Sequence, residues 1–302
     1  MTWPYEAIHA HVLPTGKVMF WTRGDHSQLW DPASNTVTAT ATSGANIFCS
    51  SHAFLPDGRV LVAGGHISNW VGLPNAYIYS PFNGTWTRLP DMNDGRWYPT
   101  STTLPNGDVL TVSGWINTTQ GVNVEPQVWQ TATNSWRYLT AAHLALPFYP
   151  FMHVAPNGKV FYAGPSQATR YLNVSGTGSW SSVGNSNYGT RNWGSSVLYD
   201  KGKVLLVGGT TDAPYSRGST PTATAEIIDL NGSTPTWTYT GSLSAPRKLH
   251  NATLLPDGKV LITGGSQGGE DPNTKPANPA YTSEMWDPAT GTWTTMASIT
   301  DI

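Results

Sequence analysis

Short apolar stretches alternate with glycine-centred turns along the whole chain. Six times an apolar stretch runs into such a turn, usually Pro-Asp-Gly or Pro-Asn-Gly, and a β-branched stretch leaves it and often ends in Gly-Gly. Because these residues suit the backbone angles of tight turns, each copy predicts a β-hairpin. The six copies are VLPTGKVMFW, FLPDGRVLVAGG, TLPNGDVLTVSG, VAPNGKVFYAG, LYDKGKVLLVGG and LLPDGKVLITGG.

The hairpins recur with a regular period. Successive turn glycines lie 42 to 56 residues apart, close to the roughly 50-residue period of kelch propeller blades. A more polar pair of predicted strands follows each hairpin, and a tryptophan in five of these pairs is expected to pack between neighbouring blades. The turn glycines are Gly16, Gly58, Gly107, Gly158, Gly202 and Gly258, and the tryptophans are Trp86, Trp136, Trp180, Trp237 and Trp293.

This period favours an all-β, kelch-type β-propeller that forms a single domain over residues 1–302. A four-stranded blade cannot bury both faces alone, so blades must stack side by side, which also protects their strand edges. A β-sandwich would not show so regular a repeat.

The composition excludes several classes of protein. The chain has 16 Lys+Arg against 18 Asp+Glu and 11% charged residues, less than half the usual share, so it is not expected to bind nucleic acid. It has no apolar run long enough to span a membrane, and its start, MTWPYEAIHA, does not read as a signal peptide. Either the protein is intracellular or its front end is missing. Five sequons permit glycosylation in a secreted eukaryotic protein: Asn83, Asn117, Asn173, Asn231 and Asn251.

The only cysteine, Cys49, lies nine residues before its turn glycine, and Tyr98 lies nine before the next one. Equal offsets should mean equal places in adjacent blades, at the start of the innermost strands beside a central channel. The sulfur of Cys49 is therefore predicted to lie against the Tyr98 ring, within about 4 to 5 Å. The same offset selects Ala7, Tyr149, Trp193 and Leu249.

A resemblance extends over nearly the whole chain. NIFCSSHAFLPDGRVLVAGG, DGRWYPTSTTLPNGDVLTVSGW, GKVFYAGPS, KGKVLLVGG and LHNATLLPDGKVLITGG, in that order, resemble the copper radical oxidases of the galactose oxidase and glyoxal oxidase family. The resemblance implies a thioether bond between Cys49 and Tyr98, with the modified tyrosine acting as copper ligand and stable radical. It also implies oxidation of a primary alcohol or aldehyde by O2, with release of H2O2. The simpler interpretations are a small buried hydrophobe for Cys49 and ordinary aromatic packing for Tyr98.

Further roles follow from the same resemblance. Trp115 is the candidate for the indole stacked on the modified tyrosine, and Tyr149 and Trp193 are expected to line the channel through which substrate enters. The family has four copper ligands, and only the counterpart of Tyr98 is found here. The best match to its Tyr-His pair is Leu249-His250. Structural hydrogen bonds, rather than copper binding, are predicted for His52, His66, His153 and His250.

The resemblance also predicts that the chain is an incomplete seven-bladed ring, since the family has seven hairpins and this chain has six. A genuine six-bladed protein is the alternative. The 302 residues alone are expected to be inactive. Family members that act on galactose have an arginine near the position of Tyr149, and LALPFYPFMHVAPNG has none, so a small aldehyde or another alcohol is as reasonable a substrate as a hexose.

Two functional classes therefore stay open. The first is a copper radical oxidase with an alcohol, aldehyde or carbohydrate substrate, extracellular by resemblance. The second is a non-catalytic kelch propeller that binds a protein or a glycan. A monomer with no nucleic-acid or membrane partner is expected in either case.

Overall fold

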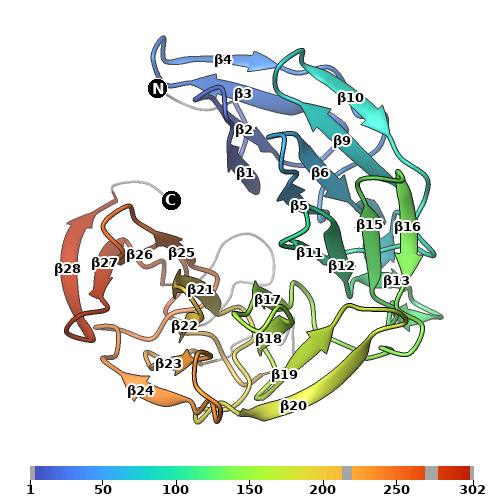
Figure 1. Ribbon diagram of the computed structural model, residues 1–302. Helices are drawn as coiled ribbons and strands as arrows, with labels where there is room; N and C mark the ends of the chain where they lie inside the picture. The colour runs from blue at the N-terminus through green and yellow to red at the C-terminus, as the bar shows by residue number, and fades with distance from the viewer. Residues whose placement is uncertain (1–3, 213–219, 269–277, 300–302) are drawn as a thin grey trace. The chain divides into compact units, whose positions relative to one another are not determined.

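The computed structural model describes residues 4–212, 220–268 and 278–299. These residues form strands, turns and loops, and the strands make six four-stranded antiparallel blades of a β-propeller (Figure 1). The predicted fold class is therefore confirmed. Within the same residues no helix is long and apolar enough to cross a membrane. The chain divides into two compact units, and the prediction of a single domain stays a prediction.

Unit 1 comprises Met1–Pro150 and Val174–Ser179 and contains the first three blades. The first blade has the order β1 (His9–Val12), β2 (Val18–Trp21), β3 (Ser27–Asp31), β4 (Thr36–Ala39). The second has β5 (Ser51–Phe54), β6 (Val60–Ala63), β9 (Ala76–Ser80), β10 (Thr85–Arg88). The third has β11 (Thr100–Thr103), β12 (Val109–Val112), β15 (Gln127–Gln130), β16 (Ser135–Tyr138). Two small hairpins are inserted, β7 (His66–Ser68) with β8 (Val71–Gly72) and β13 (Trp115–Asn117) with β14 (Gly121–Val122).

Unit 2 comprises Phe151–Asn173 and Trp180–Ile302 and contains the remaining three blades. The fourth blade has β17 (Phe151–Val154), β18 (Val160–Gly164), β19 (Ala168–Asn173), β20 (Ser179–Asn185). The fifth has β21 (Ser195–Asp200), β22 (Lys203–Val207), β23 (Ala225–Asp229), β24 (Thr238–Thr240). The sixth has β25 (Asn251–Leu254), β26 (Val260–Thr263), β27 (Thr282–Asp287), β28 (Thr292–Ser298).

All six predicted hairpins are present, and each joins the first two strands of a blade. In the second blade Gly58 N donates to Leu55 O at 2.9 Å and Leu55 N donates to Arg59 O at 2.8 Å, which closes the turn. Gly58 has φ 84°, a left-handed conformation that glycine adopts without steric cost. The other five turn glycines have φ between 70° and 85°. The residues of each turn therefore determine where the first two strands of a blade are joined.

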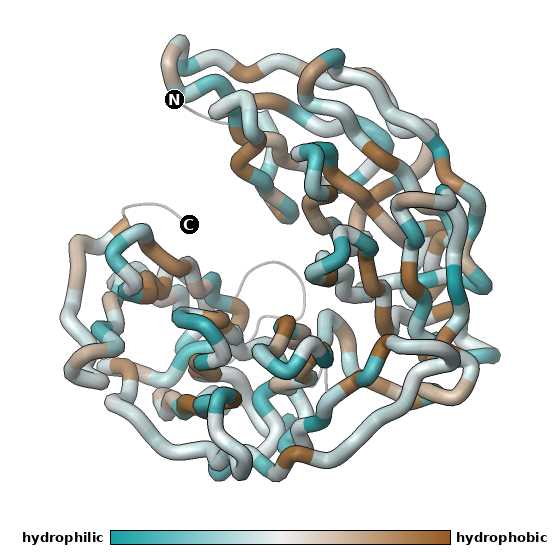
Figure 2. Tube along the Cα trace, viewed as in Figure 1, coloured by the Kyte–Doolittle hydropathy of each residue, from teal (hydrophilic) through white to brown (hydrophobic). Residues whose placement is uncertain are grey.

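The second and third strands of each blade carry most of its core. All four residues of β6 and of β12 are buried, and hydrophobic residues mark these strands in Figure 2. Outer strands such as β4 and β28 are mostly exposed. A strand buried on both faces loses the hydrophobic-polar alternation of a surface strand, which explains the continuous apolar runs after each turn.

Four of the five repeated tryptophans connect neighbouring blades, as predicted. The indole of Trp136 donates to Pro90 O at 2.8 Å, and that of Trp293 donates to Gly241 O at 2.6 Å; both acceptors follow the last strand of the preceding blade. Trp86 donates in the same way to Ala41 O, whereas Trp237 donates to the Thr169 hydroxyl on β19 of the preceding blade, at 3.4 Å. Burying the ring while satisfying its N–H is what a buried tryptophan requires.

The glycine pairs that end the hairpins allow another backbone to approach closely. A Cβ atom added at Gly64 would collide with the carbonyl oxygen of Arg96, and one added at Gly208 would collide with that of Arg247. Each arginine lies in the segment that leads into the first strand of the following blade. The glycines therefore position the segments that carry the candidate site residues.

Candidate functional site

Residues nine before the turn glycine share one unusual backbone conformation. Cys49, Tyr98, Tyr149, Trp193 and Leu249 all have positive φ, between 45° and 65°. Left-handed backbone is uncommon for residues other than glycine, so five repeats at one offset show that the offset selects equivalent places in successive blades. Ala7, at the same offset in the first copy, does not share this conformation.

In unit 1 these residues are joined by backbone hydrogen bonds from blade to blade. Tyr98 N donates to Cys49 O at 2.9 Å, and Tyr149 N donates to Tyr98 O at 2.9 Å. In unit 2 Leu249 N donates to Trp193 O at 2.7 Å in the same manner. The prediction that Cys49 and Tyr98 are neighbours on adjacent blades is therefore confirmed.

The side chains of Cys49 and Tyr98 also meet. Cys49 is fully buried, and its thiol lies within interaction range of the side chains of Tyr98 and Trp97. Burial raises the pKa of the Cys49 thiol to about 12, although polar interactions with these two side chains and with the nearby Arg23 act in the opposite direction. The thiol is consequently protonated at neutral pH, which distinguishes it from a cysteine that acts as a thiolate nucleophile.

Aromatic rings surround Tyr98. Trp97 stacks on it with ring centroids 4.2 Å apart and an interplanar angle of 25°. Phe148 meets it edge-on at 5.3 Å, and Tyr149 lies tilted at 4.8 Å. Such offset and edge-to-face arrangements stabilise aromatic clusters beyond the area they bury. Tyr98 therefore sits in a close-packed, largely apolar setting.

The stacked indole in the structure is Trp97, and Trp115 lies farther out in the same cluster. Trp115 forms a two-way backbone bridge with Trp97, with N···O distances of 2.9 and 2.7 Å. Its ring contacts Phe148 at 5.8 Å and Trp70 at 5.4 Å. Trp97 is adjacent to Tyr98 in the motif GRWYPT, and this adjacency was the signal that could have pointed to it. The catalytic role of Trp115 stays a prediction.

Trp97 is itself held by His66 of the small β7–β8 hairpin. The indole Nε1 donates to His66 Nδ1 at 3.0 Å. Partial burial, with a smaller effect of Arg23, lowers the pKa of His66 below its ordinary 6.5. His66 is thus neutral at pH 7 and able to accept this bond, which fixes the orientation of the ring stacked on Tyr98.

Three histidines meet beside this site, a feature that sequence reasoning missed. His9 Nδ1 lies 3.2 Å from His52 Nε2, and the His11 and His52 rings are 4.2 Å apart. Burial lowers the pKa of His9 to about 3 and that of His11 to about 4, and it lowers that of His52 as well. We refer to His9, His11 and His52 as the histidine cluster. Its members are neutral at physiological pH.

The predicted hydrogen-bonding roles hold for three of the four histidines singled out from the sequence. His52 bonds to His9, His66 to Trp97, and His153 Nε2 to Ser196 Oγ at 2.8 Å. The prediction is wrong for His250, because neither of its buried ring nitrogens has a hydrogen-bond partner. Its ring instead packs closely against Gly208, so close packing holds this side chain in place.

The residues that the structure describes do not assemble a copper site. Among them, no group of three or more His, Cys, Asp or Glu side chains is arranged to hold a metal ion. Tyr98 is the one copper ligand predicted from the sequence, and a tetragonal copper centre requires several nitrogen and oxygen donors. The described side chains therefore do not supply enough donor atoms to hold a copper ion.

Tyr149 lies next to Tyr98 and also contacts the histidine cluster. Its ring is 6.4 Å from that of His9, and its hydroxyl donates to Ser50 O at 3.4 Å. Trp193 occupies the equivalent backbone position in unit 2. Their predicted roles in a substrate channel stay predictions.

Comparison with known proteins gives consistent results. The family model described as "Glyoxal oxidase N-terminus" matches residues 17–300. A galactose oxidase of Gibberella zeae is 29% identical over 332 residues, which cover 96% of this chain and 46% of that protein. An aldehyde oxidase, GLOX, of Vitis pseudoreticulata is 26% identical over 293 residues, with 87% and 52% covered. The chain thus spans about half the length of these curated relatives.

Among solved structures, a copper-bound fungal alcohol oxidase of the AA5 family superposes with a TM-score of 0.83 at 24% identity, covering 96% of this chain and 64% of that one. YjhT superposes with a TM-score of 0.64 at 15% identity. At these identities the two likenesses support the fold alone.

Proposed function

Because the chain belongs to the glyoxal oxidase N-terminus family, we propose that it supplies the cysteine-tyrosine half of a copper radical oxidase. The reaction is oxidation of a primary alcohol or an aldehyde by O2, which is reduced to H2O2. The observation that carries the proposal is the contact between Cys49 and Tyr98 across two blades. The repeated left-handed backbone sets both residues at equivalent places, and what distinguishes this pair is that one place holds the chain's only cysteine and the next a tyrosine.

The site prepares a thioether bond between the two side chains. The Cys49 sulfur bonds to a ring carbon of Tyr98 next to the hydroxyl, and one hydrogen leaves each partner. O2 accepts the two electrons and two protons and becomes H2O2, so atoms and electrons balance. Burial excludes other thiols and keeps the Cys49 sulfur beside one ring.

The remaining residues of the site keep Tyr98 in place. Trp97 covers one face of its ring, and His66 fixes Trp97. Copper, when bound, would supply a one-electron acceptor beside the tyrosine. The described residues do not make a copper site, so its other ligands would have to come from outside these residues.

Intact-mass measurement tests the proposal. After exposure to O2, in parallel samples with and without added Cu(II), the 302-residue chain is expected to lose two hydrogen atoms, whereas Cys49→Ala and Tyr98→Phe lose none. A Cys49–Tyr98 cross-linked peptide should appear after digestion. An unchanged mass in the unsubstituted chain would overturn the proposal for this chain.

Activity is a separate expectation. The 302 residues alone should produce no peroxide from galactose or from small aldehydes in a peroxidase-coupled assay, because Tyr98 alone does not hold copper. We propose an extracellular, monomeric, single-domain protein. The alternative is a non-catalytic propeller that binds a protein or a glycan.

A further inference from the structure

A pocket opens at the turn end of the fourth and fifth blades in unit 2. It has a volume of about 430 Å³, within the range of small-molecule sites. Three segments line it: the β17–β18 turn, β19 and the connection that follows β23. The lining residues are Pro156, Asn157, Tyr171, Leu230, Asn231, Gly232, Ser233 and Pro235.

This pocket lies away from Trp193 and Leu249, the unit 2 residues that share the left-handed backbone conformation. Pro156 follows β17 and approaches Gly202, the glycine of the β21–β22 turn. Trp193 and Leu249 precede β21 and β25 and therefore lie at the opposite strand ends. A ligand bound in the pocket would not contact those residues.

Hydrogen bonds fix the segments that form the pocket. Asn231 Nδ2 donates to Lys201 O at 2.8 Å and to Asp229 Oδ1 at 2.7 Å, and Leu230 N donates to Gly202 O at 2.7 Å. On the other side Lys159 N donates to Asn157 Oδ1 at 3.0 Å. The pocket is thus formed before a ligand arrives, which limits the entropy lost on binding.

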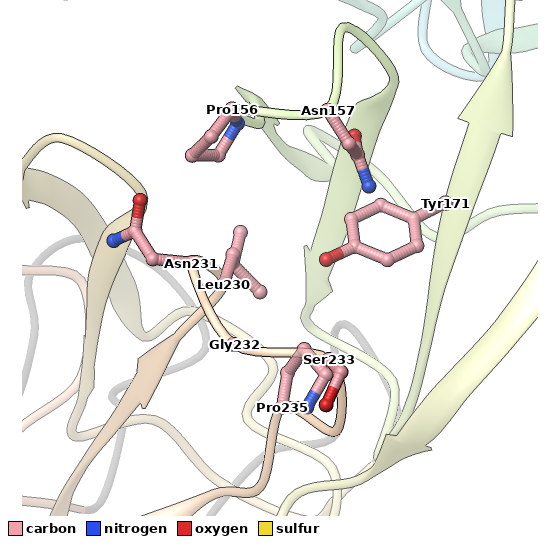
Figure 3. Close-up of a pocket in the computed structure, with 8 residues that line it drawn as sticks. All are labelled: Pro156, Asn157, Tyr171, Leu230, Asn231, Gly232, Ser233 and Pro235. Atoms are coloured by element: carbon pink, nitrogen blue, oxygen red, sulfur yellow. The ribbon is translucent and has the colours of Figure 1, made fainter.

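Figure 3 shows how the side chains face the pocket. The Tyr171 hydroxyl points across the pocket toward Leu230, with Pro156 and Asn157 on one side and Ser233 and Pro235 on the other. The Asn231 amide is turned away, consistent with its two hydrogen bonds. One aromatic ring, two prolines and a leucine therefore provide apolar contact beside three polar groups.

The lining carries no charged side chain. Burial raises the pKa of Tyr171, opposed by a hydrogen bond with Asn157, so its phenol is neutral at physiological pH. An ammonium ligand would find no carboxylate among the lining residues. The nearest cation, Lys159 Nζ, lies over the Tyr171 ring, 5.9 Å from its centroid, and is already engaged by that ring. The lining suits a neutral molecule that has both apolar faces and many hydroxyl groups.

Carbohydrates have this combination. The C–H face of a sugar ring packs on an aromatic side chain, and its hydroxyls bond to amides, hydroxyls and backbone groups. We propose that this pocket binds a neutral carbohydrate of one or two sugar units, with the Tyr171 ring as the stacking platform on the face that Lys159 does not cover, and with Asn157 and Ser233 as hydrogen-bonding partners. This site is separate from the proposed oxidase site and does not depend on it.

Saturation-transfer NMR titrations of copper-free protein test the proposal, so that binding is measured without turnover. The probes are lactose, cellobiose and N,N′-diacetylchitobiose, with glucose 6-phosphate as the charged comparison. The protein is produced without N-glycosylation, because the Asn231 sequon borders the pocket. At least one neutral probe is expected to bind with a Kd of about 0.1 to 10 mM.

Matched variants locate the binding site. Tyr171→Ala should weaken binding at least about tenfold, whereas Tyr171→Phe, which keeps the ring, should weaken it less. Tyr239→Ala removes a tyrosine that is 55% exposed on β24, outside the pocket, and should bind as the unsubstituted protein does. Thermal melts verify that each variant folds. Failure of all three neutral probes to saturate, or equal binding by the Tyr171→Ala and Tyr239→Ala variants, would overturn the proposal.

Discussion

Unit 1 and unit 2 bury the same arginine in equivalent blades but surround it differently. Arg96, Arg191 and Arg247 each lie eleven residues before a turn glycine. In each case Nη1 donates to the carbonyl oxygen just after the second strand: Ser113 O, Gly208 O or Gly264 O. The backbone therefore holds the guanidinium in the same way in both units.

The side chain opposite the arginine differs. In unit 2 Arg191 and Arg247 pair with Glu226 at 2.7 Å and with Glu284 at 3.0 Å. In unit 1 the equivalent partner of Arg96 is the amide of Gln127, at 3.0 Å. Burial lowers the pKa of Arg96 to about 9, although Glu125 and Asp94 act in the opposite direction. Unit 1 thus keeps a buried cation without a paired carboxylate, directly before Trp97 and Tyr98.

The units also differ in their histidines. Unit 1 holds three adjacent neutral imidazoles, the histidine cluster, whereas His153 in unit 2 bonds to a serine and His250 packs against glycine. Blades with one backbone plan therefore tolerate very different buried polar groups, provided that each group is neutral or hydrogen-bonded. The two units thus share a backbone plan and differ in the polar side chains that are buried within it.

Acid should have the largest effect, because it destabilises both units and unit 1 more than unit 2. Unit 2 holds two separate buried imidazoles, with a pKa of about 4 for His153 and about 3 for His250, whereas the three imidazoles of the histidine cluster in unit 1 lie against one another. The pKa of His9 is about 3 and that of His11 about 4 when folded, against about 6.5 when unfolded. The unfolded chain therefore binds more protons between these values, and stability falls as pH drops from about 6.5 toward about 3. Each pKa unit corresponds to about 1.4 kcal/mol, so the loss should reach several kcal/mol.

Hydrogen exchange at pH 7, 5 and 4 measures this prediction. Peptides of β1 and β5 should lose protection first, because charging one imidazole of the histidine cluster raises the cost of charging the next. Peptides of β17 and β25, beside the separate imidazoles of His153 and His250, give the matched comparison in unit 2 and should lose protection at lower pH. Earlier loss of protection in unit 2 would contradict the prediction.

Glu226→Ala should have the next largest effect. It leaves the fully buried Arg191 without its carboxylate and removes the acceptor of two backbone N–H groups, those of Asn187 and Tyr188. Breaking a buried pair from one side typically costs about 3 to 5 kcal/mol. Urea unfolding measures the loss, and Asp57→Ala, which breaks an exposed pair with Arg59, should cost less than about 1 kcal/mol. Equal losses of stability from Glu226→Ala and Asp57→Ala would contradict the expectation that the buried pair stabilises the protein more than the exposed one.

Gln127→Glu should stabilise the protein by about 1 kcal/mol. The Gln127 amide nitrogen is buried without a hydrogen-bond partner, and a carboxylate would replace it with an acceptor beside Arg96. A higher urea midpoint at pH 7 that disappears near pH 4 is expected. A lower midpoint at pH 7 would show that Glu125 and Asp94 already balance the charge of Arg96.

The parts of this structure that depend on local chemistry could be predicted from the sequence. Each turn is specified by its own few residues, and the phase of the repeat then places Cys49 beside Tyr98. The stacking of Trp97 depends on side-chain rotamers, and the contact of His9 with His52 joins residues 43 positions apart, so neither follows from repeat phase. The arginines eleven before the turn glycines were visible in the sequence, but only the structure shows which side chain lies opposite each.

The smallest effect concerns the shared left-handed position itself. Leu249 has φ 58° and a side chain that is 43% exposed, so Leu249→Gly should relieve backbone strain and raise stability by about 0.5 kcal/mol, after allowance for the greater freedom of the unfolded chain. Leu254→Gly is the matched control, because Leu254 is also 43% exposed but lies in β25 with ordinary backbone. Leu254→Gly should lower the free energy of unfolding by about 1 kcal/mol.

Cys49→Gly relieves the same strain yet removes a fully buried side chain, so it should destabilise the protein. Urea midpoints of the three variants measure the prediction, and a stabilising Cys49→Gly would mean that the buried sulfur contributes nothing to the fold.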